Sequence, residues 1–399
     1  MSANEDLLQS RSKLLPSLSM ASNHSLGYRP WTDSGMGTVA NGMVTNSISK
    51  SYYNGSYGID MAWTVWNGNQ NRNNIKLSRL QVEQAEKDSA TTANSIKEQI
   101  ATLYVQMIYL DEAIKVSRKN LETSIKNEER GREMAKIGKM CEADLAQLAA
   151  QTAQDKYNIV DAEATFSEHR LQLKQLLEIN EESSFNIRIP QIPDERLLAE
   201  LPSPATVYET ALTTRPEIAS SRISIKSNEV SAKIAKAGMM PVIGLTGGVS
   251  TSTTSRNDKA WNSQIKTNLD TYVGVSLSIP IFDNRKTKTA VNKANIARTE
   301  SILEFEDRKK QLYSAIEGHW LDAKLYRQKY EAAKASVSSG QKSYDLLSEQ
   351  FRLGLKNIVE LMTGKANLLT AQQNMLQSKY MALLSMNMLE FYRGGEIDL

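Results

Sequence analysis

The sequence predicts a mainly α-helical protein with a smaller β portion, built from two copies of one structural unit. The segment GIDMAWTVWNG at 58–68 returns as GVSLSIPIFDN at 274–284, and KIGKMCEADL at 136–145 returns as RLGLKNIVEL at 352–361. The matched glycines of both pairs, Gly58 with Gly274 and Gly138 with Gly354, are 216 positions apart. Unrelated similar strings would not share one offset, so we infer an internal two-fold repeat.

Composition limits the classes of protein that fit. The chain has 399 residues, 9 prolines, one cysteine and a net charge of +3. Few prolines favour long helices, and no run of about 18 apolar residues predicts a membrane-spanning helix. Without a basic stripe, nucleic acid is not expected as a partner. A single cysteine, Cys141, excludes an internal disulfide.

The start of the chain resembles the end of a helix. Residues 1–13 carry no basic segment followed by an apolar one, so no secretory signal peptide is visible in this chain. The matching stretch of the second copy is a full helical pattern at about 206–237. We therefore interpret the first copy as lacking about its first two dozen residues, together with a signal, judged against its own repeat. A signal-free cytoplasmic protein is the competing interpretation.

Four segments alternate between apolar and polar residues, which is typical of amphipathic strands. They lie at about 16–28, 55–66, 241–253 and 269–282. Polar stretches rich in Gly, Ser, Thr and Asn separate the strands of each pair, at 29–56 and 254–268, and are expected to be loops.

Long helical hairpins follow each pair of strands. The first is expected at about 76–178 and the second at about 286–392, with Gly138 and Gly354 ending the longer helix of each hairpin. Those longer helices would each extend about 90–100 Å. The first repeat thus covers 1–180 and the second 206–399, joined by a proline-rich connector at 181–205.

The strands are about as long as the 9 to 11 residues that cross a bilayer. Four strands cannot close a membrane barrel, which needs at least about eight, and open edges in lipid leave backbone groups without partners. A membrane location therefore requires other subunits to complete the barrel, whereas a small soluble sandwich is the alternative. Six aromatic residues near the strand ends are candidates for the membrane interface: Tyr28, Trp31, Tyr57, Trp63, Trp66 and Tyr272.

These patterns resemble the TolC-type outer-membrane efflux proteins. The resemblance rests on the twin segments ending in Trp66-Asn67-Gly68 and Ile281-Phe282-Asp283-Asn284, on Arg215-Pro216-Glu217-Ile218, and on the twin turns at Gly138 and Gly354. It implies a homotrimer in the outer membrane of a Gram-negative bacterium, with a shared twelve-stranded β-barrel in the lipid and an α-helical barrel in the periplasm. It also implies two partners, a periplasmic adaptor protein and an inner-membrane transporter.

The resemblance also assigns roles to residues at the hairpin turns. The tip that meets the adaptor would comprise Ile137, Gly138, Lys139, Leu353, Gly354 and Leu355. Some relatives carry two aspartates after the second turn, and the matching positions are Glu360 and Thr363, with Asp144 at the equivalent of Glu360 in the first copy. A ring of Glu360 carboxylates would favour cations in a narrow pore. The alternatives are an ordinary helix cap for the glycines and a solvated surface carboxylate for Glu360.

No enzymatic site, metal site or cofactor is expected. His24, His169 and His319 are scattered, and His319 with Asp322 is interpreted as a solvated helix face. No phosphate-binding glycine loop, CxxC pair or activated nucleophile is present. We expect a passive exit duct of an efflux or type I secretion system, gated at the helical tips. A periplasmic coiled-coil adaptor or scaffold without a pore is the alternative.

Overall fold

The computed structural model describes residues 1–31, 36–39, 42–45, 50–180, 185, 187, 193, 196–197 and 199–397. Most of the expected connector at 181–205 therefore lies outside the described residues. The chain divides into two compact units, with unit 1 comprising 1–86 and 220–304, and unit 2 comprising 87–219 and 305–399. Each unit draws on both sequence repeats, so the compact units and the repeats follow different boundaries.

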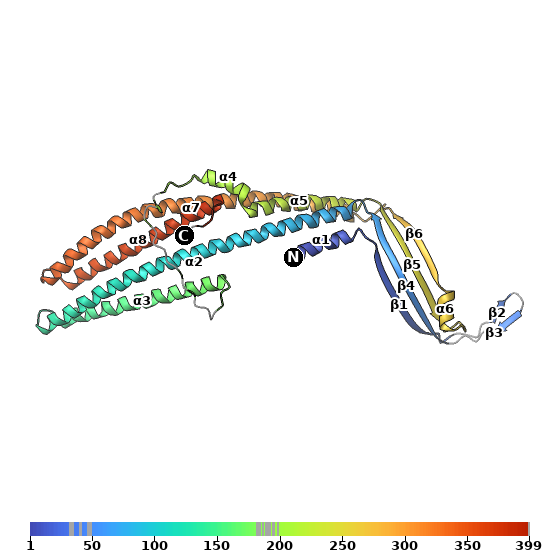
Figure 1. The fold of residues 1–399 in the computed structure, drawn as a ribbon, viewed down its shortest axis with the longest axis horizontal. Coiled ribbons are helices and arrows are strands. Elements are labelled where there is room, and N and C mark those ends of the chain that lie inside the picture. Colours follow the sequence, from blue (N-terminus) through green and yellow to red (C-terminus); the bar gives the residue numbers. More distant parts are fainter. Residues whose placement is uncertain are drawn as a thin grey trace. The chain divides into compact units, whose positions relative to one another are not determined.

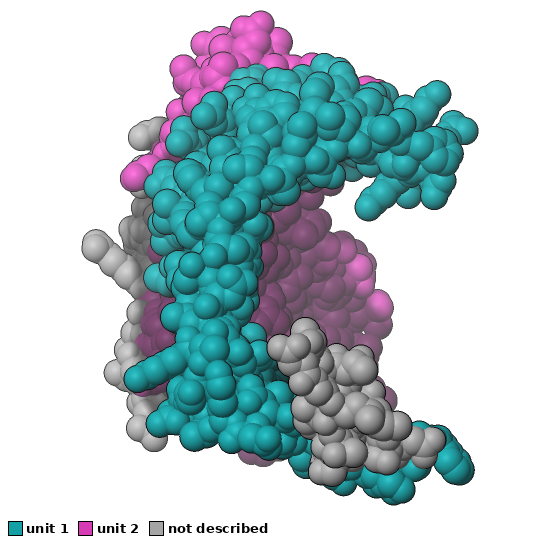
Figure 2. All heavy atoms as spheres, turned by 90° about the vertical axis from the view of Figure 1, so that its right-hand side faces the viewer, with its two compact units in different colours: residues 1–86, 220–304 teal, residues 87–219, 305–399 magenta. Residues whose placement is uncertain are grey.

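Unit 1 contains a four-stranded antiparallel sheet (Figure 1). Its strands are β1 (Ser17–Tyr28), β4 (Ser51–Trp66), β5 (Val242–Thr254) and β6 (Asp270–Ser278), in the order β1-β4-β5-β6. Viewed end-on, unit 1 (teal in Figure 2) forms an open arc. The four segments expected from alternation are these strands, although β6 ends at Ser278 and not near residue 282.

The two polar stretches between paired strands are not entirely loop. Residues 29–56 hold a small hairpin of β2 (Met36–Val39) and β3 (Gly42–Thr45), together with the first residues of β4. Residues 254–268 hold a short helix, α6 (Trp261–Thr267). Gln264 of α6 accepts a hydrogen bond from the backbone N–H of Thr254 at 2.8 Å, which holds this helix against the end of β5. A polar composition predicts exposure but does not exclude such local structure.

The register of the sheet separates its residues into two faces, because residues directly opposite in antiparallel strands point the same way. Leu18 lies opposite Met61, and Met20 lies opposite Ile59. Across β5, the same face carries Leu245 and Val249, and β6 adds Val273 and Val275, which are exposed. The other face carries small and polar residues, for example Ser19, Gly58, Thr246, Gly274 and Ser276. The sheet therefore exposes one apolar and one polar face.

The long helical hairpins occur as expected. The first consists of α2 (Gln70–Lys136) and α3 (Glu142–Leu176), and the second of α7 (Lys286–Arg352) and α8 (Ile358–Arg393). Both α2 and α7 contain 67 residues. A short helix, α1 (Ser2–Ser12), precedes β1. No helix among the described residues is long and apolar enough to cross a membrane.

The single helix expected at 206–237 is wrong, because two helices occupy this range. α4 (Pro204–Thr214) ends before Arg215, and α5 (Pro216–Ala237) follows it. Arg215 has an extended backbone, with φ −74° and ψ 127°. Proline disfavours the helical conformation of the residue before it, and Pro216 cannot donate a backbone hydrogen bond, so the helix breaks here.

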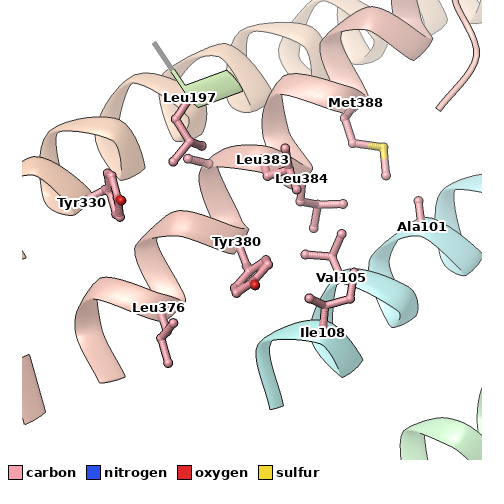
Figure 3. Packing of buried hydrophobic residues seen from close by; sticks show 11 residues of the cluster. Ala101, Val105, Ile108, Leu197, Tyr330, Leu376, Tyr380, Leu383, Leu384 and Met388 are labelled. Carbon is pink, nitrogen blue, oxygen red and sulfur yellow. The ribbon is translucent and has the colours of Figure 1, made fainter. Parts of the chain in front are cut away.

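The apolar core of unit 2 lies between its helices. Figure 3 shows Val105 and Ile108 of α2 packed near Tyr380 and Leu384 of α8. A second cluster joins α4, α5, α7 and α8 around Ile218 and Ile316, which are fully buried. A third, closer to the hairpin turns, includes Leu148, Tyr344, Phe351, Ile358, Leu361 and Leu368. The two hairpins are thus packed together within unit 2.

Candidate functional site

The two hairpin turns share one backbone design. After α2, Gly138 has φ +71°, and after α7, Gly354 has φ +74°. The N–H of Lys139 donates to the carbonyl of Met134 at 2.8 Å, and the N–H of Leu355 donates to that of Gln350 at 2.9 Å. This is the Schellman pattern that ends helices with a left-handed glycine. A side chain at either glycine would meet no atom within 4 Å, so the backbone angle and not crowding favours glycine.

The turns present exposed apolar side chains. Ile137 at the first turn, and Leu353 and Leu355 at the second, are all exposed. The expected tip residues thus lie at the ends of their hairpins, at the surface of unit 2. Their role in docking an adaptor stays a prediction. Cys141 is also exposed, as a free thiol at the start of α3.

Glu360, expected at a pore constriction, is engaged in local interactions. Its carboxylate accepts from Lys356 Nζ at 2.5 Å and from the backbone N–H of Asn357 at 3.3 Å. Asn357 in return accepts from the N–H of Glu360 at 2.9 Å, which completes a capping box at the start of α8. Lys356 and these hydrogen bonds lower the pKa of Glu360 below its ordinary value. The carboxylate therefore stays ionised, but a lysine partly offsets its charge.

The other two expected gate residues lie near the same turns. The hydroxyl of Thr363 donates to the carbonyl of Val359 one turn back, at 2.8 Å. Asp144 lies in the first turn of α3, where a carboxylate is favoured by the helix dipole. Their part in a gate stays a prediction.

A buried charged network joins the two hairpins and was not anticipated from the sequence. Lys365 of α8 is 5% exposed and Asp155 of α3 is 4% exposed. Lys365 Nζ lies 2.5 Å from Asp155 Oδ2, and Ser124 of α2 donates to the same oxygen at 2.5 Å. Lys365 Nζ also contacts Ser124 Oγ, and Gln151 donates to the second carboxylate oxygen at 2.8 Å. Three helices from two hairpins therefore meet at one ion pair.

Arg215, in the break between α4 and α5, is the centre of a second cluster. Its guanidinium donates to Glu98 of α2 at 3.0 Å and to Glu217 at 2.8 Å, and it is 7% exposed. It also lies over the rings of Tyr392 and Phe391 of α8, at 4.3 Å and 5.0 Å from their centroids. Burial raises the pKa of Tyr392 to about 12. An arginine is suited to this position because its planar guanidinium can donate hydrogen bonds to two carboxylates while it stacks on aromatic rings.

The aromatic residues expected at a membrane interface do not all share one environment. Tyr28 and Trp31 are exposed, and Trp66 is opposite Ile243 on the apolar face. Trp63 also lies on the apolar face, and its indole N–H donates to the carbonyl of Leu14 at 2.8 Å.

Tyr57 and Tyr272 differ from each other in the face that they occupy. Tyr57 packs edge-on against Trp261 of α6, at a centroid distance of 6.1 Å. Tyr272 pairs with Gly248 on the polar face, and its hydroxyl donates to Asp60 across β5 at 2.9 Å. The missing side chain of Gly248 leaves room for this ring. Tyr272 therefore lies on the polar face of the sheet and Tyr57 on the apolar face, and the place of these aromatic residues at a membrane interface stays a prediction.

The comparison with protein families decides the class of this chain. The model described as outer membrane efflux protein matches residues 1–178 and 207–395. The chain belongs to the outer membrane efflux protein family.

The chain is similar to outer-membrane proteins of several bacteria. The chain is 20% identical to the outer membrane efflux protein BepC of Brucella suis, covering 82% of this chain and 69% of the relative. It is 24% identical to the pyoverdine export outer membrane protein OpmQ of Pseudomonas aeruginosa, covering 81% and 65%. It is 20% identical to the outer membrane protein TolC of Escherichia coli, covering 96% and 75%.

Solved structures of channel proteins share the fold. CusC matches with a TM-score of 0.82 at 14% identity, covering 99% of this chain and 86% of CusC. The open state of the MtrE channel of Neisseria gonorrhoeae matches with a TM-score of 0.75 at 17% identity, covering 100% and 84%. The family is one of channel proteins and not of enzymes. No group of three or more potential metal ligands occurs in the part of the chain that the structure describes.

The environment of His319 differs from the one expected from the sequence. It was expected on a solvated helix face, but it is half-buried, and its ring lies 5.7 Å from that of Tyr392. Burial lowers the pKa of His319 below its ordinary value. The mixed apolar and polar spacing around this residue does not distinguish a solvated position from one covered by another helix.

We predict that removing one partner of the Lys365–Asp155 ion pair destabilises the protein more than replacing both partners. Asp155→Ala leaves the buried ammonium without its carboxylate, and such a change costs about 3–5 kcal/mol. The double variant Asp155→Leu with Lys365→Met should regain most of this loss, because two apolar side chains replace both charges. Thermal unfolding of detergent-purified protein, followed by circular dichroism, gives the order of stabilities.

The exposed pair of Lys126 with Glu122 on α2 is the matched control for this experiment. Lys126→Met should change stability by less than about 1 kcal/mol, because exposed pairs contribute little. A double variant of the buried pair that is less stable than Asp155→Ala would contradict the prediction.

We also predict that acid destabilises the protein through His319. Because its pKa is lowered in the folded state, the unfolded chain binds more protons as pH falls below the ordinary value of about 6.5. The contribution of His319 to stability is thus present above that pH and is lost below it. His319→Phe removes the titrating group but keeps an aromatic ring near Tyr392. Its melting temperature should therefore fall less between pH 7.5 and pH 5.5 than that of the unaltered protein. An equal fall in melting temperature in both proteins would show that His319 does not cause the acid destabilisation.

Proposed function

We propose that this chain is one subunit of a homotrimeric outer-membrane exit duct. It would passively conduct substrates that an inner-membrane transporter and a periplasmic adaptor deliver. The observation that carries the proposal is the sheet of unit 1, which combines an exposed apolar face with two unpaired edges. Family membership favours this function over the alternative of a periplasmic adaptor or scaffold without a pore.

The edges of the sheet argue for other copies of the chain. Among the strands that the structure describes, β1 pairs only with β4, and β6 pairs only with β5. Strands can cross a bilayer only when every backbone group is paired, because lipid offers no hydrogen-bond partners. If β6 of one copy pairs with β1 of the next, three copies give a closed barrel of twelve strands, an even number as in bacterial barrels.

The faces of the sheet argue for lipid outside and water inside. The apolar rows run along β5 from Ile243 to Thr251. The eight steps from Ile243 to Thr251, at about 3.3 Å each, span about 26 Å along the strand, which is comparable to the apolar band of about 25 Å on known barrels. At its far end, the band meets Tyr57 and Trp261, as aromatic girdles do. The opposite face, rich in Gly, Ser and Thr, suits a water-filled lumen.

The hairpin turns are the parts of unit 2 that suit a docking and gating role. Their exposed Ile137, Leu353 and Leu355 offer apolar contacts to an adaptor. Glu360, Thr363 and Asp144 lie within two turns of helix from them. Opening would separate the hairpins near these turns, which the buried pair of Lys365 with Asp155 opposes from the interior.

The barrel can be tested by disulfide cross-linking in a Cys141→Ser background. Cysteines at Ser17 or Ser19 of β1, combined with cysteines at Ser276 or Ser278 of β6, should give covalent dimers and trimers on oxidation. The matched control places cysteines at Ser56 and Ser252, which lie directly opposite in β4 and β5. That control should cross-link only within one chain.

The unaltered protein should also show discrete conductance steps in planar bilayers. A monodisperse monomer that is soluble without detergent and shows no conductance would refute the proposal.

The ion pair at the second turn predicts an effect on ion selectivity. If Glu360 lines the pore, Lys356→Gln leaves its carboxylate uncompensated and should raise the preference for cations. Glu360→Gln should shift the preference toward anions. Reversal potentials across bilayers in a KCl gradient measure both effects. Lys309, paired with Glu306 at 2.9 Å on α7, is the control, and Lys309→Gln should leave the potential unchanged. An unchanged potential in both turn variants would place Glu360 outside the constriction.

A further inference from the structure

A second apolar feature of unit 1 lies where β6 leads into α7. Ile281 is 96% exposed and Phe282 is 84% exposed, and Met239 nearby is also exposed. These side chains border a hollow of about 420 Å³, whose lining also includes Arg285 and Lys288. We refer to Met239, Ile281, Phe282, Arg285, Lys286 and Lys288 as the junction patch.

The junction patch is strongly basic. Arg285, Lys286 and Lys288 are exposed, and none forms an ion pair within the described residues. The nearby carboxylate of Asp283 is already engaged, because it accepts from the backbone N–H of Thr287 at 2.8 Å. Asp283 keeps its negative charge, because hydrogen bonds from the side chain and backbone of Thr287 lower its pKa, so the three cations beside these large apolar side chains leave a net charge of +2.

The equivalent junction of the first repeat supplies an internal comparison. There, Gly68 and Asn69 both have φ +64°, as Asn284 and Arg285 have φ +51° and +66°. The backbone is therefore the same, but Asn69, Gln70 and Arg72 stand in place of Arg285, Lys286 and Lys288. Asparagine tolerates the left-handed conformation better than arginine does. The second junction thus carries two more positive charges, one of them in an unfavourable backbone conformation.

The position of the patch indicates what could neutralise it. It continues from the exposed apolar face of β6, where Val275 and Leu277 lie. If that face is in lipid, the patch is at the membrane boundary next to the helices. Phospholipid headgroups occupy this depth, and basic residues flanking an apolar surface bind anionic headgroups.

We propose that the junction patch binds an anionic phospholipid of the leaflet next to the helices. Arg285 and Lys288 would hold the headgroup phosphate, and Ile281 and Phe282 would contact the acyl chains. The inference rests on the proposed function, since it requires the sheet to be in a bilayer.

The test uses the full chain, purified in detergent and analysed by native mass spectrometry with added lipid. The protein should retain phosphatidylglycerol in preference to phosphatidylcholine with the same acyl chains. The variant Arg285→Asn with Lys288→Gln should bind phosphatidylglycerol on the order of tenfold more weakly, because each cation near a lipid surface contributes appreciably. Arg285→Asn reproduces the residue of the first repeat, so the backbone should be preserved. The control Arg72→Gln, at the equivalent junction, should bind as the unaltered protein does.

Four outcomes would overturn the inference. Equal retention of the two lipids would remove the headgroup preference, and an equal loss in Arg72→Gln would remove the assignment to this junction. Competition by inorganic phosphate at the same concentration as the lipid would indicate a free anion site. A Phe282→Cys variant, in the Cys141→Ser background, that cross-links to a second copy would assign the patch to a subunit contact.

Planar-bilayer conductance separates this inference from the function on which it rests. The Arg285→Asn with Lys288→Gln variant should still form channels, because neither side chain is placed in the lumen. Conductance without lipid preference would refute only the lipid site. Absence of conductance in the unaltered protein would refute the proposed function itself.

Discussion

The unpaired edges of the four-stranded sheet are the constraint on which the other properties of this protein depend. Among the described residues, no strand pairs with the outer edges of β1 and β6, and a sheet with such free edges and an open apolar face is not a stable isolated structure in water or in lipid. Both requirements are met together if copies of the chain close a barrel in a bilayer. The polar face, where Gly248 admits the ring of Tyr272 to reach Asp60, then borders water.

The helical unit meets a different requirement, which is to hold two hairpins together while leaving their turns exposed. Its interior combines apolar clusters with two polar nodes, around Lys365 and around Arg215. A buried ion pair adds little net stability compared with apolar residues, but its disruption is costly. Such a node therefore favours one packing of the hairpins over alternatives that would separate the charges.

The internal repeat provides a frame for recognising what is specific to each copy. The two turns share their glycine angles and hydrogen bonds, yet only the second is followed by a capping box with Glu360. The two strand-to-helix junctions share their left-handed turns, yet only the second carries Arg285 and Lys286. Backbone features are common to the copies, whereas charges differ. Functional differences between the copies are therefore expected where side chains face solvent, lipid or partners.

The sequence by itself determined the four strands of the main sheet and the two long hairpins, because period, glycine and proline act locally. Alternation located β1, β4, β5 and β6, and Gly138 and Gly354 located the turns. Pro216 also carried the signal for the break at Arg215, although the helical period around it concealed the break. Only the tertiary structure decided which distant side chains meet. Lys365 and Asp155 are 210 residues apart, and His319 becomes half-buried beside Tyr392. These outcomes depend on how helices pack against one another, and a local pattern of residues carries no information about that packing.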